Sequence, residues 1–206
     1  MEPIVLSDGD RARIRDAIVA AEARTSGEIF TVVARISDDY RFIPTLWATL
    51  AALAVPLPLV WFTMLPAGQI YLIQLAVFIA LALLFSLPPL RLWLVPRFVK
   101  ERRAHALALQ QFLAHGLHLT EERTGILIFV SLGERYAEIV ADTGIDEKVE
   151  KTIWKESVEG LVAEIRRGRL ADGLVATIGH LGAVLAAHFP PRPRDVNELS
   201  DDLILL

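Results

Sequence analysis

The chain has 206 residues, a formal net charge of −4 at pH 7 and no cysteine. The lack of cysteine excludes disulfide bonds and thiolate metal sites, and it suits a reducing compartment. The acidic balance argues against a nucleic-acid-binding protein, which needs a basic face.

The first predicted elements are a helix and a strand. Ser7 or Asp8 can cap a helix that runs to about Arg24, because its apolar residues recur on one stripe. The nearly continuous β-rich run Glu28–Ile36 predicts a strand that is buried on both faces. Such a strand is not stable by itself, so it requires a partner elsewhere in the chain.

A long apolar segment follows this strand. Residues 42–90 contain no Asp, Glu, Lys, Arg or His. Within them, Leu46–Leu65 and Ile70–Leu87 are each long enough to cross most of a hydrocarbon core of ~30 Å, at ~1.5 Å per residue. The breaker residues of Pro66–Gln69 predict a short turn between them. The segment therefore predicts two transmembrane helices joined as a tight hairpin.

Two prolines complicate the first of these helices. Pro56 and Pro58 each remove a backbone donor, so we expect a kink there, and a re-entrant or broken helix is an alternative. Two buried core helices of a soluble protein are a further alternative. Buried helices of globular proteins seldom lack every charge over two such lengths, which favours the membrane hairpin.

Basic residues flank the apolar segment on both sides. Arg35 and Arg41 precede it, whereas the predicted turn has neither Lys nor Arg. The segment after it carries Arg91, Arg97, Lys100, Arg102 and Arg103. By the positive-inside rule, both ends of the hairpin should be cytoplasmic. The basic segment either marks this topology alone or also contacts anionic lipid headgroups.

The remaining elements complete an α/β domain. A helix over about Val99–His115 precedes a second buried strand, Gly125–Leu132, so the two buried strands should be parallel. Tyr136–Asp142 is expected beside them as an antiparallel neighbour. The hairpin is then an insertion within one domain, which comprises residues 1–41 and 91–189.

Two helices and a tail follow. We predict a helix with Asp146 as its N-cap that runs to about Arg167, and a last helix that begins at Asp172-Gly173. Residues 190–206 form a Pro-rich, acidic tail that ends in Leu203–Leu206. The tail is either disordered or docks through this apolar end on the domain or the membrane.

The order of these elements resembles the TPM-domain family. The resemblance rests on the stretches Ser26–Ile29, Thr124–Ser131, Arg135–Asp142, Gly144–Asp146 and Gly168–Leu174. Thr124 stands where the family usually has Asn, and Asp142-Thr143-Gly144 keeps one glycine of a Gly-x-Gly turn. The inserted hairpin is similar to that of a bacterial membrane-protein branch. The resemblance implies a mixed sheet between helices and, for some members, calcium binding and acid-phosphatase activity.

Candidate site residues lie at one turn. Asp142, Asp146 and Glu147 could supply oxygen ligands to a hard cation, Ca²⁺ or Mg²⁺, although an N-cap with neighbouring surface acids explains them as well. The five histidines, His105, His115, His118, His180 and His188, lack ligand spacing to a carboxylate. No nucleophile elbow, phosphate-binding loop or dinucleotide motif is present, so we assign no catalytic residue.

These observations favour one function and leave an alternative. The favoured function is an interaction or assembly module, anchored in the bacterial plasma membrane with both termini cytoplasmic. Its partners are the lipid bilayer and a membrane protein. The alternative is a divalent-metal-dependent phosphatase acting on phosphate esters. A transporter or pore is disfavoured because the two helices carry no ionisable residue, and the oligomeric state is open.

Overall fold

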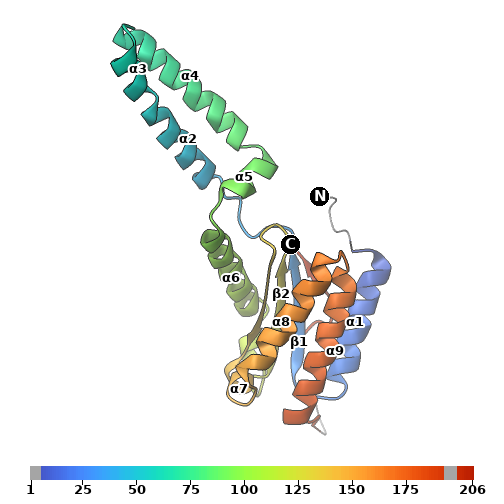
Figure 1. Cartoon of the computed structure of the whole chain (residues 1–206). Coiled ribbons are helices and arrows are strands. Elements are labelled where there is room, and N and C mark those ends of the chain that lie inside the picture. Colours follow the sequence, from blue (N-terminus) through green and yellow to red (C-terminus); the bar gives the residue numbers. More distant parts are fainter. Residues whose placement is uncertain (1–5, 193–198) are drawn as a thin grey trace. The chain divides into compact units, whose positions relative to one another are not determined.

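The computed structural model describes residues 6–192 and 199–206. The chain divides into two compact units. One comprises the chain up to Ser37 and from Arg103 onward, and the other comprises Asp38–Arg102. The first unit is a four-stranded sheet with helices on both faces, and the second is helical (Figure 1). The predicted fold class, a mixed sheet between helices, is confirmed.

The sheet has the strand order β3-β2-β1-β4. β1 (Glu28–Ala34) and β2 (Gly125–Ser131) lie side by side and parallel, with Glu28 opposite Gly125. β3 (Tyr136–Ala141) is antiparallel to β2. Every residue of β1 and β2 is buried, as their continuous apolar runs predict. Although the segment that holds the second unit separates β1 from β2 in sequence, the two strands are neighbours in the sheet.

Helices cover the two faces of the sheet unequally. α1 (Asp8–Glu22), α8 (Lys151–Arg166) and α9 (Leu170–His188) lie on one face, and α6 (Arg97–Ala114) lies on the other (Figure 1). The larger core joins Ile29 and Val33 of β1 to apolar residues of the three helices. The smaller core joins the other face of the same strands to Ala104, Ala108 and Phe112 of α6.

α1 and α9 pack closely in this unit. Ser7 caps α1 in a capping box, where its side chain accepts the N–H of Asp10 and its own N–H bonds to the Asp10 carboxylate. A Cβ atom on Gly182 of α9 would lie 2.6 Å from the Cβ of Ala21, so only glycine permits this approach. The last helix begins at Leu170, two residues before the predicted start.

The end of the C-terminal tail belongs to the sheet. β4 (Ile204–Leu205) pairs in parallel with β1, where the N–H of Leu206 donates to the carbonyl of Val33 at 3.0 Å. The apolar end therefore docks on the domain, which is one of the outcomes predicted for it. Residues 193–198 of the predicted tail lie outside the described residues.

The second unit contains the predicted pair of helices. α2 (Phe42–Ala54) and α3 (Pro56–Phe62) are separated only by Val55, directly before the first of the two prolines, and α4 (Ala67–Phe85) returns beside α2. A short helix, α5 (Pro88–Leu94), follows. Phe42–Phe62 and Ala67–Phe85 are both long and apolar enough to cross a membrane.

The position of the turn differs from the prediction. The chain turns over Thr63–Pro66, and Ala67 to Gln69 form the first turn of α4. The cause is the carbonyl of Pro66, which accepts the N–H groups of Gln69 and Ile70 at 2.9 and 3.2 Å and so starts the helix. The predicted turn at Pro66–Gln69 is wrong by about three residues.

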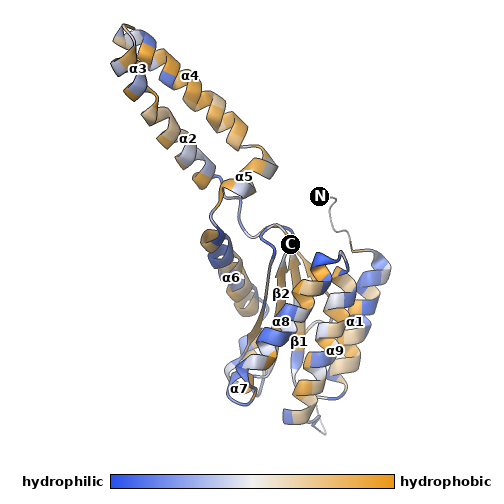
Figure 2. Ribbon diagram, viewed as in Figure 1, coloured by the Kyte–Doolittle hydropathy of each residue, from blue (hydrophilic) through white to orange (hydrophobic). Residues whose placement is uncertain are grey.

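Apolar side chains of these helices face outward. Only 6% of the Ala67–Phe85 window and 17% of the Phe42–Phe62 window are buried. Trp61 and Phe62 are more than four-fifths exposed. Figure 2 colours α4 as hydrophobic over almost its whole length. An apolar surface of this extent is not stable against water, so it must be covered by lipid or protein.

Candidate functional site

The turn after β3 holds the predicted ligand residues. Asp142 is the N-cap of a short helix, α7 (Thr143–Asp146), and its Oδ1 accepts the N–H of Thr143 at 2.7 Å. The backbone carbonyl of Asp142 accepts the N–H of Asp146 at 3.0 Å. The prediction of Asp146 as an N-cap is therefore wrong, because Asp142 already starts the helix. The next helix, α8, begins only at Lys151.

Asp142 is the most enclosed of these acids. Its exposure is 5%, and its Oδ2 is buried with no hydrogen-bond partner among the described residues. The guanidinium of Arg123 lies near the other oxygen of the carboxylate, with Nη1 3.9 Å from Oδ1. A buried carboxylate oxygen without a donor is a position where a cation or a proton donor is stabilised.

The other two acids do not join Asp142 in an enclosed site. Asp146 and Glu147 are exposed, at the end of α7 and directly after it. Within residues 6–192 and 199–206, no three His, Asp or Glu side chains lie close enough to hold a metal ion. The turn thus supplies one buried carboxylate with an adjacent guanidinium, and the donor set does not fit a complete metal site.

Two glycines hold this region together. A Cβ atom on Gly125 would lie 2.6 Å from the carbonyl oxygen of Leu117, and one on Gly144 would lie 2.4 Å from that of Glu122. Thr124 donates its hydroxyl to the carbonyl of Ser26 at 3.1 Å. The motif residues at these positions therefore pack the strand ends against the preceding turn.

A second group of carboxylates, which sequence reasoning missed, lies at the start of β1. Glu28 is buried opposite Gly125, and Glu22 accepts the N–H of Ile29 at 2.8 Å. Burial raises the pKa of Glu22 to about 8, and the nearby carboxyls of Glu28 and Asp201 act in the same direction. The three acids come from separate segments. The sequence signal that could have revealed this group is Glu28, a glutamate within a strand predicted to be buried on both faces.

The hydroxyl and imidazole groups form further local contacts. Ser131 is fully buried, where it donates to the Glu134 carboxylate and contacts the Ser37 hydroxyl at 2.8 Å. His105 Nδ1 lies 2.9 Å from Glu138 Oε2, which also accepts the Tyr136 hydroxyl. The first contact set ties the ends of β1 and β2, and the second ties α6 to β3. Ser131 is closed to a substrate, whereas the His105 side chain is 53% exposed.

Comparisons with known proteins identify the domain. Residues 89–184 match the family model of the TPM domain. Those residues are a TPM domain. The match covers α6, β2, β3 and α8 and most of α9, whereas β1 and α1 precede it. β1, which pairs with β2 in the sheet, therefore comes from a segment before the match.

A solved structure has a similar fold. The BA42 protein from the psychrophilic bacterium Bizionia argentinensis, determined by NMR, is 20% identical, with a TM-score of 0.63. The similarity covers 100% of this chain and 97% of that chain. At this identity the comparison supports the fold alone. The chain matches none of the curated proteins with which it was compared.

Proposed function

We propose that this TPM-domain protein is anchored in the bacterial plasma membrane and acts as an interaction or assembly module at its cytoplasmic face. The observation that carries the proposal is the hairpin: two apolar, outward-facing helices without an Asp, Glu, Lys, Arg or His. In water this surface would drive aggregation, whereas a bilayer covers it at no such cost. A lipid environment also requires that backbone N–H and C=O groups be paired within the protein, and the hydrogen bonds of the helices pair them.

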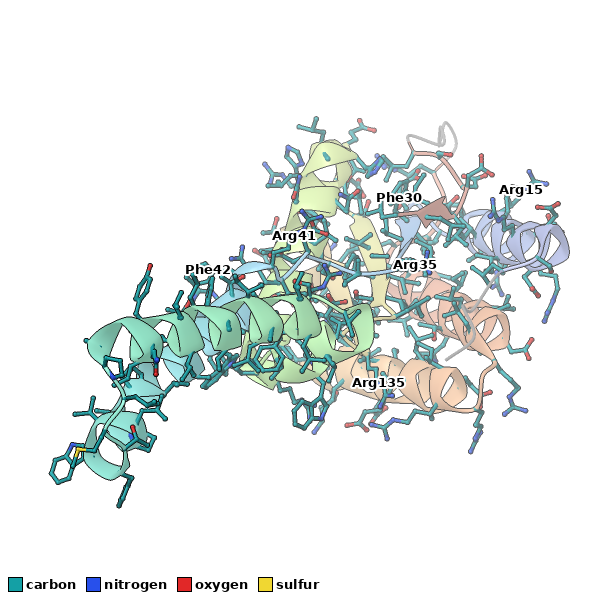
Figure 3. The ribbon with its side chains drawn as sticks, turned by 90° about the horizontal axis from the view of Figure 1, so that it is seen from above. Arg15, Phe30, Arg35, Arg41, Phe42 and Arg135 are labelled. Atoms are coloured by element: carbon teal, nitrogen blue, oxygen red, sulfur yellow. The ribbon has the colours of Figure 1, made fainter. Side chains whose placement is uncertain are left out.

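The charges at the two ends of the hairpin support the orientation. Arg41 directly precedes Phe42, where the apolar helix begins (Figure 3), and Arg97 lies after α5. The turn Thr63–Pro66 carries no cation. The positive-inside rule then places the turn outside and the TPM domain inside the cell. Trp93 and Phe98 are 79% and 70% exposed and stand among these cations in the sequence, a composition typical of a segment at the membrane interface.

The structure of the domain supports a binding role over a chemical one. The hydroxyl of Ser131 is buried and contacts Glu134 and Ser37, so it is inaccessible to a substrate. A folded α/β domain joined to a membrane anchor is the composition expected of an adaptor that gathers a membrane partner. The partner proposed here is a membrane protein, recognised at the cytoplasmic surface.

The orientation can be tested because the chain has no cysteine. A cysteine at Met64, in the turn, should react with a membrane-impermeant maleimide in intact cells. A cysteine at Lys155, on the exposed side of α8, should react only after the cells are permeabilised. Labelling of both sites in intact cells would contradict the orientation. The binding role is tested by cross-linking in native membranes, where repeated recovery of the chain without a partner would contradict it.

The alternative function is a divalent-metal-dependent phosphatase. The observation that favours it is the buried Oδ2 of Asp142, which lacks a hydrogen-bond partner among the described residues. Ca²⁺ or Mg²⁺ would be held by Asp142 and Asp146 and would supply a positive charge to a phosphate ester. Since the donor set is incomplete, no reaction step is assigned to it.

A titration distinguishes this alternative. Ca²⁺ or Mg²⁺ should raise the unfolding temperature of the intact protein if an ion binds its folded state. Asp142→Asn is the sharper variant, because the amide oxygen can still cap α7 while the ligand charge is lost. Hydrolysis of phosphate esters should then fall with the ion-dependent shift. An unchanged unfolding temperature and no hydrolysis above the buffer would reject the phosphatase.

A further inference from the structure

One polar side chain lies inside the apolar hairpin without a partner. Gln74 is in α4, and it makes no side-chain hydrogen bond with any described residue. It follows Ala67 by seven residues and precedes Phe85 by eleven, which places it about 10 Å and about 16 Å from the ends of the helix. In a bilayer the carboxamide would therefore lie deep in the hydrocarbon, near its centre.

A carboxamide at this depth requires a partner. It has two N–H donors and an acceptor oxygen, and each unmet group in hydrocarbon is unfavourable by several kcal/mol. The hydroxyl of Thr49, on the neighbouring helix, already donates to the carbonyl of Thr45 at 2.9 Å, so it has no proton left to donate to the carboxamide oxygen of Gln74. Lipid tails offer neither donors nor acceptors, so the partner must come from another polar group.

The surroundings of Gln74 leave space for such a group. Gln74 lines a shallow groove of about 150 Å³ between α2 and α4, together with Thr49 and Ala52 of α2 and Phe78 of α4. The wall is apolar apart from Gln74, Thr49 and Tyr71. A small apolar groove with one unmet carboxamide suits a second helix that carries a carboxamide of its own.

A second copy of the chain meets this requirement by symmetry. Copies inserted with the same topology carry Gln74 at the same depth, and a two-fold axis along the membrane normal brings identical residues together. A carboxamide is both donor and acceptor, so two of them satisfy each other. We infer that the α2–α4 groove is a homodimer interface within the bilayer, held by the Gln74 pair. This inference rests on the proposed membrane anchoring of the hairpin.

The test measures association of the full chain in liposomes. The cysteine-free chain accepts one cysteine at Met64, in the exposed turn, for donor and acceptor dyes. Energy transfer is followed as the protein is diluted with lipid, and we expect a reversible monomer–dimer curve. Gln74→Leu should weaken dimerisation by roughly 3- to 30-fold, the range for hydrogen bonds between membrane helices. Gln74→Asn, which keeps the carboxamide, should weaken it less.

Two controls locate the effect. Gln69→Leu removes the same group from the exposed first turn of α4 and should leave the curve unchanged. A cysteine at Phe78, in the groove, should form a disulfide between copies, whereas one at Leu83 should not. Leu83 is 68% exposed and lies on the opposite side of α4.

Three results would overturn the inference. They are energy transfer that never exceeds random proximity, a dimer that is indifferent to Gln74→Leu, and cross-linking at Leu83 but not at Phe78. Failure of the membrane anchoring has a different signature. The protein would then not float with the liposomes or would be removed by an alkaline wash, and only floated protein is used for the dilution curve.

Discussion

Two helices of this chain share their length and their apolar character but lie in opposite surroundings. α4 and α9 each have 19 residues, and each is apolar enough to cross a membrane. The helix window is 6% buried in α4 and 50% buried in α9. α9 is covered by α1 and α8, whereas α4 packs mainly against α2. Length and hydropathy therefore define a candidate span, but the presence of covering elements decides whether a bilayer is needed.

Truncation of one large side chain in each helix should give the largest contrast. Ile178 of α9 is fully buried in the larger core, so Ile178→Ala should lower the free energy of unfolding by about 2–5 kcal/mol. Leu83→Ala on the outer side of α4 should change it by less than about 0.5 kcal/mol. Urea unfolding in nanodiscs, followed through Trp154 with the other tryptophans replaced by Phe, measures both. Equal effects would remove the distinction between the helices.

A charge placed on each helix tests the bilayer directly. Ala76 of α4 and Ala176 of α9 are both exposed. Arginine near the centre of a spanning helix costs about 3 kcal/mol of insertion free energy. Ala76→Arg should thus release part of the protein from membranes during an alkaline wash, whereas Ala176→Arg should not. Release by the α9 variant would show that α9 also contacts lipid.

Glycines within α9 sharpen the comparison further. Gly182→Ala forces a Cβ against that of Ala21, at 2.6 Å, and should destabilise the domain by about 1–3 kcal/mol. Gly179→Ala is the matched control, since among described residues nothing lies within 4 Å of a Cβ there. It should stabilise α9 by about 0.5–1 kcal/mol through helix propensity. The opposite order in the same unfolding assay would mean that α1 and α9 separate in the membrane-bound protein.

Local sequence patterns predicted the central elements of the fold well. β1 and β2 are continuous runs of β-branched and aromatic residues, and their parallel pairing follows from the crossover between them. Such patterns could not predict β4, because a strand of two residues has no periodicity. Its position depends instead on the free edge of β1, with which it pairs. The turn before α4 was misplaced because Pro66 caps the helix rather than starting the turn.

The candidate site was less predictable, because it also depends on contacts that no local sequence pattern determines. Asp142 was identified from its place at the end of a strand, but the sequence analysis assigned the cap to Asp146, because any aspartate before a helical stretch is a favourable cap. The choice depends on which carbonyl starts the helix. The group formed by Glu22, Glu28 and Asp201 depends on strand register and on the docked tail, neither of which leaves a local signal.

The last and smallest contrast between the two regions is their dependence on pH. The hairpin has no ionisable residue between 42 and 90 except Tyr71, whereas the domain buries carboxyl groups. The pKa of Glu22 rises from 4.5 to about 8 on folding, so the folded state holds a proton that the unfolded state releases. The resulting stability is complete below pH 4.5 and is lost as the pH rises through about 8. Between pH 7 and 9 the unfolding free energy of the domain should fall by roughly 1 kcal/mol, whereas Glu22→Gln should flatten this dependence. Extraction of the hairpin from membranes should be constant over the same range. A pH slope that persists in Glu22→Gln would assign the proton to another group.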